Sequence, residues 1–136
     1  MLGQDSASYE ARVRDTSTGT NGTLSPEFVS TTALGSGDTH VVLSYNEGEV
    51  SVFLDGVLDE TNTAGGVLNN WDDAHYLVFG GAYGGGSHWN GTLKRVAIYD
   101  SAFNAIQANN VYNGNAPGTG ESGVSGSGSV QWDEQD

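Results

Sequence analysis

The stretch that decides the fold is THVVLSYNEGEVSVFLDGVLDE, residues 39–60. Short runs of β-branched and aromatic residues are divided by glycine-containing breaks at residues 46–48 and 55–56. The Asp-Gly pair of the second break predicts a two-residue hairpin, because a type I′ turn needs positive φ at both positions. Alternation with period two assigns the side chains of the middle run to two faces. One face takes Val50, Val52 and Leu54, and the other takes Ser51 and Phe53. The stretch therefore predicts three antiparallel strands, which we call the meander.

Further strands are predicted on both sides of the meander. Residues 8–14 alternate, with Tyr9, Ala11 and Val13 expected on a buried face and Glu10, Arg12 and Arg14 on a wet face. Shorter strands are expected at residues 27–31 and 75–79. A longer strand is expected at residues 91–99, with Val96 and Ile98 as core candidates.

A short helix and a tail follow the last predicted strand. Asn104 suits an N-cap and Gln107, three residues on, suits a capping box, so we expect a helix over about residues 105–112 with Gly114 just past its end. Residues 116–136 are rich in Gly and Ser and end in acidic residues around one Trp. Our hypothesis is that this tail docks on a neighbouring copy of the chain.

The composition limits the class of protein and its partners. The chain has 136 residues, 21 of them Gly, which favours one turn-rich all-β domain. Its net charge of -13 would repel nucleic acid and anionic membrane surfaces, and leaves cations, neutral sugars and basic proteins as partners. There is no Cys, which excludes thiol chemistry, and no apolar run approaches the length of a membrane span. We therefore expect neither nucleic-acid binding nor membrane insertion.

Several motifs carry a family resemblance. They are LGQDSASYEARVRDTSTGTNGT at residues 2–23, the meander, LNNWDDAHYLVFGG at residues 68–81, and WNGTLKRVAIYDSAFNAIQ at residues 89–107. In this order and spacing they resemble the laminin-G-like, concanavalin A-like jelly-roll domains of secreted and surface proteins. The resemblance implies an antiparallel jelly-roll β-sandwich with one short C-terminal helix, formed by residues 1–115. The family places several more strands ahead of the first motif, so we expect about seven strands and the C-terminal portion of the domain.

The acidic residues do not predict an enzyme. Some members of the wider superfamily are glycoside hydrolases, which need two carboxylates facing each other across the sugar bond. No predicted strand carries alternating acids. Glu47 with Glu49, and Asp59 with Glu60, are interpreted as solvated residues at turns and strand ends. The three histidines have no metal-type spacing. We therefore expect no catalysis.

A cluster of oxygen-bearing side chains surrounds Trp71. Asn70, Asp72 and Asp73 supply the amide and carboxylate oxygens that Ca²⁺ prefers, and many laminin-G-like domains bind calcium through loops at a sheet edge. The alternative is that these residues only shape and cap a turn. A Ca²⁺ site at these three residues is therefore one hypothesis, with the turn as the other.

Aromatic residues beside a glycine-rich loop at residues 80–86 are the candidate ligand contacts. They are Trp71, Tyr83, His88 and Trp89. An exposed ring can stack on the apolar face of a sugar while neighbouring amides bind its hydroxyls. Packing into the sandwich is the favoured alternative for the two Trp residues, because large aromatics are usually buried. Tyr83 and His88 are the better contact candidates.

Two functions are compatible with these observations. The first is a lectin-like adhesion module, extracellular or on a surface, that recognises carbohydrate or a protein partner. The second is a structural subunit of a filament, fibre or viral appendage that assembles through its tail and edge strands.

Overall fold

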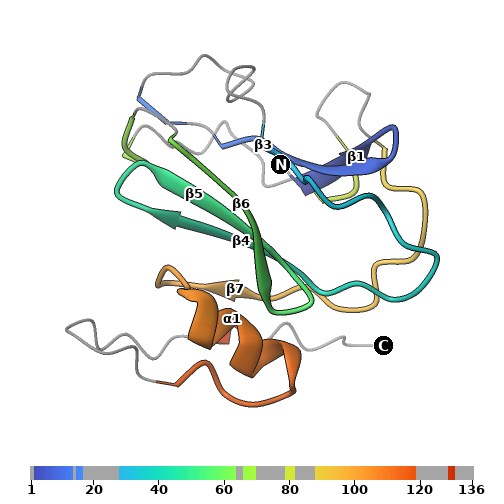
Figure 1. Ribbon diagram of the computed structural model, residues 1–136. Coiled ribbons are helices and arrows are strands. Elements are labelled where there is room, and N and C mark those ends of the chain that lie inside the picture. Colours follow the sequence, from blue (N-terminus) through green and yellow to red (C-terminus); the bar gives the residue numbers. More distant parts are fainter. Residues whose placement is uncertain are drawn as a thin grey trace.

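The computed structural model describes residues 2–13, 15–16, 28–63, 66–69, 79–81, 88–118 and 129–130. These residues form two three-stranded antiparallel sheets, a two-stranded pair and one helix (Figure 1). The strands are β1 (Leu2–Asp5), β2 (Ser8–Ala11), β3 (Phe28–Val29), β4 (Val41–Asn46), β5 (Glu49–Leu54), β6 (Val57–Thr63), β7 (Ile98–Tyr99) and β8 (Ser129–Val130), and the helix is α1 (Ala105–Tyr112). The predicted all-β sandwich with one short C-terminal helix is confirmed.

The predicted meander forms the sheet β4–β5–β6. Strands β4 and β5 are joined at the pair Asn46 and Glu49, and β5 and β6 at the pair Leu54 and Val57. Each connection is a two-residue turn in which both central residues have positive φ: 47° and 93° at residues 47–48, and 50° and 78° at residues 55–56. These angles are those of a type I′ turn, whose twist matches that of the strands it joins. The local sequence therefore sets the register of the whole sheet.

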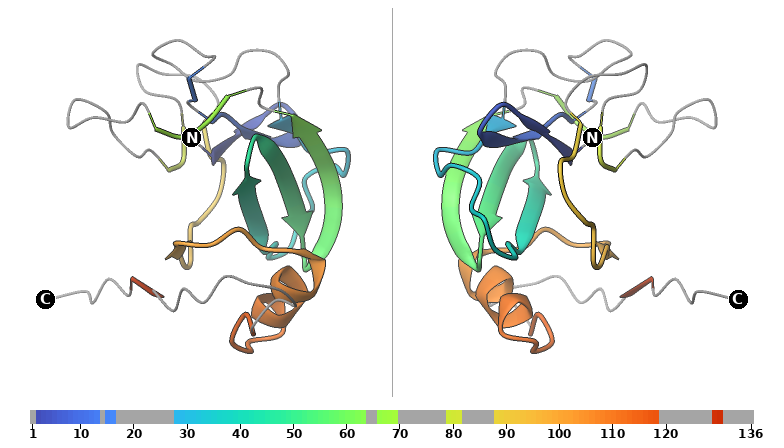
Figure 2. Two further views of the ribbon diagram at one scale, coloured as in Figure 1. Left: turned by 90° about the vertical axis from the view of Figure 1, so that its left-hand side faces the viewer. Right: turned by 90° about the vertical axis from the view of Figure 1, so that its right-hand side faces the viewer.

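The second sheet, β1–β2–β3, packs against the inner face of the meander. Strand β2 is central, pairing with β1 through Gln4 and Tyr9 and with β3 through Ala11 and Phe28. Figure 2 shows the two sheets from the sides. Buried side chains from both sheets make the core: Tyr9, Ala11, Val13, Phe28, Val50, Val52 and Leu54. The alternation predicted for residues 9–13 and 50–54 thus correctly identifies the core face.

A β-bulge in β6 ties the two sheets together. Val52 pairs with Glu60 and Phe53 with Leu58, so Asp59 is an extra residue on β6. Its carboxylate accepts hydrogen bonds from the backbone N–H groups of Thr31 and Thr32, at 2.6 and 3.0 Å. Burial raises the pKa of Asp59, but the hydrogen bonds from Thr32 and Thr31 together outweigh it and lower the pKa below its usual 3.8. The interpretation of Asp59 as a merely solvated residue is therefore wrong.

The outer face of the meander is covered by the segment that leads into α1. The Ser44 hydroxyl accepts a hydrogen bond from the Phe103 N–H at 2.8 Å and donates one to the Phe103 carbonyl at 3.0 Å. Phe53, which is 3% exposed, points to this same outer face, opposite the core. The assignment of Ser51 and Phe53 to the face opposite Val52 is confirmed, and that face is partly buried as well.

The helix has the predicted bounds and caps. Asn104 accepts from the Gln107 N–H while the Gln107 side chain accepts from the Asn104 N–H, both at 3.0 Å, which is a capping box. At the other end, Gly114 has φ of 77° and donates to the Val111 carbonyl, and Asn115 donates to the Asn110 carbonyl. These two bonds make a Schellman motif. Local sequence therefore determines where this helix begins and ends.

Two predictions of the sequence analysis are wrong. Glu10 was expected on a wet face, but it is 1% exposed and paired with Arg12, because β2 is the central strand of its sheet. The long strand at residues 91–99 is reduced to Ile98–Tyr99, and Val96 and Ile98 are 44% and 42% exposed. Among the described residues, no strand pairs with residues 91–97, so their apolar side chains are not held on the face of a sheet.

The remaining strand predictions are partly covered by the described residues. The strand expected at residues 27–31 is β3, and β1 is a strand that the alternation did not predict. Of the strand expected at residues 75–79, only Phe79 is described, and it forms a parallel bridge with Leu2. The pair β7–β8 joins Ile98 to Val130 and Tyr99 to Ser129. In the described part of the chain, no helix is long and apolar enough to cross a membrane.

Candidate functional site

The candidate binding loop is anchored at both ends on the β1–β2 sheet. Gly80 donates to the Leu2 carbonyl at 3.2 Å, and the Trp89 N–H donates to the Gly80 carbonyl at 2.9 Å. The Asn90 N–H donates to the Gln4 side-chain oxygen at 2.7 Å. These three bonds fix the two stems of the loop to each other and to β1. A loop whose base is held by strands in this way can present side chains in a defined arrangement.

Trp89 contributes to this base by packing. Its ring lies 5.6 Å from that of Tyr9, tilted by 40°, and it packs against the buried cluster of Tyr9, Val52 and Leu54. Trp89 is half-buried, so part of the indole remains accessible. The packing that the sequence analysis favoured for Trp89 is therefore observed, and a ligand contact by this residue stays a prediction.

The other predicted contact residues divide into two groups. His88 is exposed and precedes Trp89 directly, so it lies at the end of the loop stem. Trp71, Tyr83 and the three predicted calcium ligands, Asn70, Asp72 and Asp73, lie outside the described residues. Among the residues that are described, no group of three or more His, Cys, Asp or Glu side chains could hold a metal ion. Calcium binding by residues 70–73 therefore stays a prediction.

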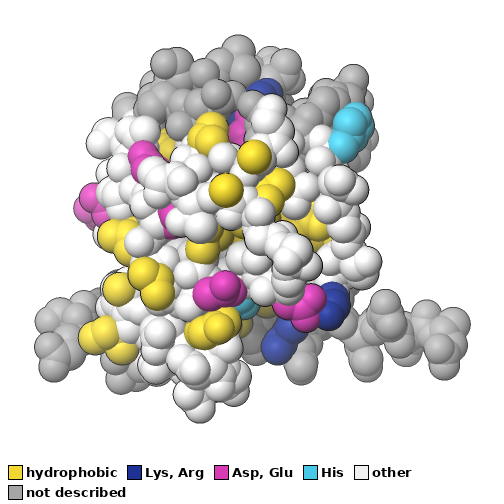
Figure 3. Space-filling view, turned by 45° about the vertical axis from the view of Figure 1, so that its right-hand side comes forward, with side chains coloured by type: hydrophobic (Ala, Val, Ile, Leu, Met, Phe, Trp, Pro, Cys, Tyr) yellow, Lys and Arg dark blue, Asp and Glu magenta, His cyan; other side chains and the backbone are white. Residues whose placement is uncertain are grey.

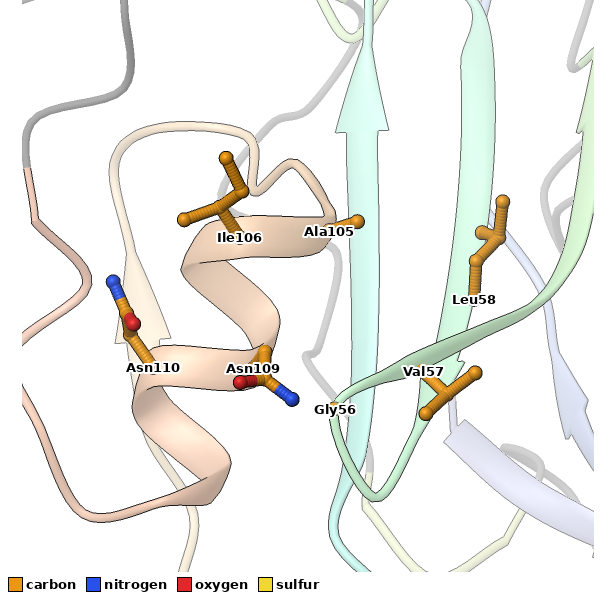
Figure 4. A pocket seen from close by; sticks show the side chains of 7 residues that line it. All are labelled: Gly56, Val57, Leu58, Ala105, Ile106, Asn109 and Asn110. Atoms are coloured by element: carbon orange, nitrogen blue, oxygen red, sulfur yellow. The ribbon is translucent and has the colours of Figure 1, made fainter.

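A second concave surface lies between α1 and the β5–β6 turn. It has a volume of about 400 Å³ and is lined by Gly56, Val57, Leu58, Ala105, Ile106, Asn109 and Asn110 (Figure 4). Figure 4 shows Asn109 pointing from the helix toward Gly56, whereas Ile106 points away from the strand. The lining has aliphatic side chains and two amides but no ionisable group. It therefore offers contact surface and hydrogen bonds, not acid–base chemistry.

The apolar residues of this groove were missed from the sequence. Val57 and Ile106 are 66% and 71% exposed, and hydrophobic side chains reach the surface in scattered patches on the face shown in Figure 3. One signal was available: Val57 and Leu58 are consecutive apolar residues, so a strand cannot bury both on one face. What that signal could not reveal is that α1 would lie beside them.

At one end of α1, His40 lies between several elements. Its ring is 6.0 Å from that of Tyr112, and its Nδ1 is buried with no hydrogen-bond partner among the described residues. Burial lowers the pKa of His40, Asp55 raises it, and Arg95 lowers it again, with a net decrease from 6.5. The neutral imidazole is therefore the form that fits this packing.

The comparisons with known proteins agree with the fold. A laminin G family profile, described as the concanavalin A-like lectin/glucanases superfamily, matches residues 2–109. The chain therefore belongs to the concanavalin A-like superfamily, as the motif order implied. Neither the curated proteins nor the solved structures gave a match to this chain. The superfamily contains carbohydrate- and protein-binding domains and also glucanases, so the class is a β-sandwich fold that both kinds of protein share.

Proposed function

We propose that the chain is a non-catalytic, lectin-like adhesion module that acts outside the cell or on a cell-envelope, filament or virion surface. The observation that carries this proposal is the loop at residues 80–90, whose stems are fixed to β1 while His88 is left exposed. A rigid base beneath a loop that contains Tyr83 suits stacking on a sugar. Carbohydrate is the first ligand class, and a surface protein is the second.

The positions of the acids support binding rather than hydrolysis. Glu47 occupies the β4–β5 turn with φ of 47°, and the Asp59 carboxylate is bonded by the backbone of Thr31 and Thr32. The Asp59 carboxylate could face a second carboxylate across a bound sugar only by giving up these hydrogen bonds. The groove beside α1 also has no acid in its lining.

A glycan array, probed with and without Ca²⁺, tests whether the chain binds carbohydrate. We expect binding that is lost in Tyr83→Ala and weakened in His88→Ala, while the matched control Ile106→Ala, in the distant groove, binds as the wild type does. If binding requires Ca²⁺, Asp72→Asn and Asp73→Asn should abolish it, because a neutral amide is a weaker ligand for that ion. No signal under either condition would exclude carbohydrate and leave a protein partner.

A structural subunit is the second candidate function. The observation that supports it is the pairing of β8, in the tail, with β7, in which tail residues form a ladder with another part of the chain. A filament or appendage subunit would use such pairing between copies. Sedimentation of the full chain across a wide range of concentration tests it, and a monomer throughout would remove this candidate.

A further inference from the structure

The two edges of the meander sheet differ in how they are protected. Strand β6 carries a bulge at Asp59 and a second acid at Glu60, which are devices that discourage a further strand from pairing. Strand β4, at the opposite edge, has neither a charged residue nor a proline nor a bulge in Val41–Asn46. Its side chains Val41, Val42, Leu43 and Tyr45 are only half-buried. Strand β4 is therefore the unprotected edge.

The register of the β4–β5 pair identifies which backbone groups of β4 are available to hydrogen-bond a further strand. Asn46 and Glu49 flank a two-residue turn and so form a hydrogen-bonded pair, and such pairs alternate along the ladder. The bond from the Asp55 N–H to the His40 carbonyl, 2.8 Å long, follows the same alternation. Even-numbered residues of β4 therefore bond to β5. The N–H and C=O groups of Val41, Leu43 and Tyr45 point away from β5, and no other described residue bonds to them.

The two ends of this edge differ in charge. The chain has only four Lys and Arg residues, and two of them are Lys94 and Arg95. The Lys94 ammonium is 2.6 Å from the Asp38 carboxylate, and Arg95 acts electrostatically on His40, so both cations lie just ahead of β4. At the other end of β4, the turn carries Glu47 and Glu49, both exposed. Asp38 and Asp55 offset the two cations at the start of β4, whereas no described cation pairs with the two acids at its end. An acidic strand end is therefore repelled less at the start of β4 than at its end.

The chain contains a segment with matching properties in its tail. Residues 129–136 read SVQWDEQD, in which Val130 and Trp132 alternate with polar residues before three acids among the last four positions. Aligned antiparallel to β4, this segment would bring its acidic end to Lys94 and Arg95. A parallel alignment would bring the acids to Glu47 and Glu49. Charge therefore selects the antiparallel direction.

We propose that the C-terminal segment 129–136 of a second copy adds to the β4 edge as an antiparallel strand. This inference deepens the structural-subunit function proposed above and rests on it. Within one copy the segment begins with β8 paired to β7, and a second copy offers a further segment 129–136 to β4. The pair β7–β8 spans two residues on each side, whereas the outward groups of β4 extend from Val41 to Tyr45. Pairing of the segment with β4 would therefore form a longer ladder of hydrogen bonds than its pairing with β7, and the two pairings compete.

Hydrogen exchange of the full chain, followed by residue and by protein concentration, tests this directly. The amides of Val41, Leu43 and Tyr45 should exchange more slowly as concentration rises, in step with an increase in sedimenting size. The amides of Val42 and Ser44 are internal controls, because they bond to β5 at every concentration. Protection of the odd-numbered amides that does not depend on concentration would mean that the chain covers its own edge, and would overturn the proposal.

Variants of the full chain distinguish assembly through the tail from assembly through other contacts. Val130→Ser with Trp132→Ser should abolish both the size increase and the slowed exchange. Lys94→Gln with Arg95→Gln should raise the dissociation constant by about tenfold, as expected for two exposed ion pairs. The control Ala33→Glu with Ala116→Glu changes the net charge by the same amount at exposed positions elsewhere and should have a smaller effect. Assembly without protection of Val41, Leu43 and Tyr45 would overturn the β4 contact but leave the subunit function, whereas absence of assembly would overturn both.

Discussion

The meander and the segment at residues 91–99 have similar sequence patterns and different structures. Both contain several β-branched and aromatic residues, and both were predicted to be strands with buried side chains. The meander forms three paired strands in which Val50, Val52 and Phe53 are at most 3% exposed. In the other segment only Ile98 and Tyr99 pair with another described strand.

The difference indicates that a strand-like pattern forms a long buried strand most readily where its partner strand follows closely in the sequence. In the meander each partner follows after a two-residue turn, so pairing costs little loop-closure entropy. The segment at residues 91–99 has no such neighbour in sequence, and its strand partner β8 lies some thirty positions further along. Pairing over that distance depends on the rest of the fold rather than on the local pattern.

The prediction with the largest expected effect concerns the replacement of one apolar residue in each region. Phe53→Ala removes a buried ring and should lower the free energy of unfolding by about 3–5 kcal/mol. Ile98→Ala removes an exposed side chain and should change it by no more than about 0.5 kcal/mol. Urea unfolding measures both. A cost for Ile98→Ala close to that of Phe53→Ala would show that the segment is packed as firmly as the meander.

The second test concerns the contact between the meander and α1. Gly56 and Gly114 have φ of 78° and 77°, so alanine at either position pays the same backbone strain, about 1–2 kcal/mol. At Gly56 a Cβ would also lie 2.9 Å from the Asn109 Cα, whereas at Gly114 nothing lies within 4 Å. Gly56→Ala should therefore cost about 1–3 kcal/mol more than Gly114→Ala in the same unfolding measurement. Equal costs would mean that the helix does not pack against this turn.

The smallest expected effect is a pH dependence of the free energy of unfolding, caused by His40, where the meander meets the segment at residues 91–99. His40 begins the meander, Arg95 belongs to the other segment, and the net pKa of His40 is lowered from 6.5 by burial and by Arg95 against the opposing effect of Asp55. Below pH 6.5 the His40 imidazole binds a proton in the unfolded chain, whereas the folded chain disfavours the protonated form. The contribution of neutral His40 to the stability of the fold is therefore complete above pH 6.5, and it declines as pH falls toward the lower pKa of His40 in the folded chain.

Thermal unfolding between neutral and mildly acidic pH measures this effect. His40→Phe should flatten the decline, because no group at residue 40 then titrates. Arg95→Gln should reduce it, because one of the two influences that lower the pKa of His40 is removed. An unchanged profile in His40→Phe would show that other groups cause the pH dependence.

Much of the fold could be predicted from the sequence because its signals are local. The turns at residues 47–48 and 55–56, the capping box at Asn104 and the glycine after α1 each act within a few residues. The candidate site was less predictable. Sequence placed His88 and Trp89 beside a loop, but the bonds from Gly80 to Leu2 and from Asn90 to Gln4 join residues more than seventy positions apart.

The sequence by itself determined the strands of the meander, the bounds of the helix and the side chains of the core face, because hydrogen bonding over two to four residues and period-two burial leave few alternatives. Only the tertiary structure decided that Glu10 is buried, that Asp59 joins the two sheets, that a groove opens beside α1 and that β4 remains an unprotected edge. Each of these depends on which distant element lies against the residue. That placement is set by the packing of the whole chain and is not encoded in any short stretch of it.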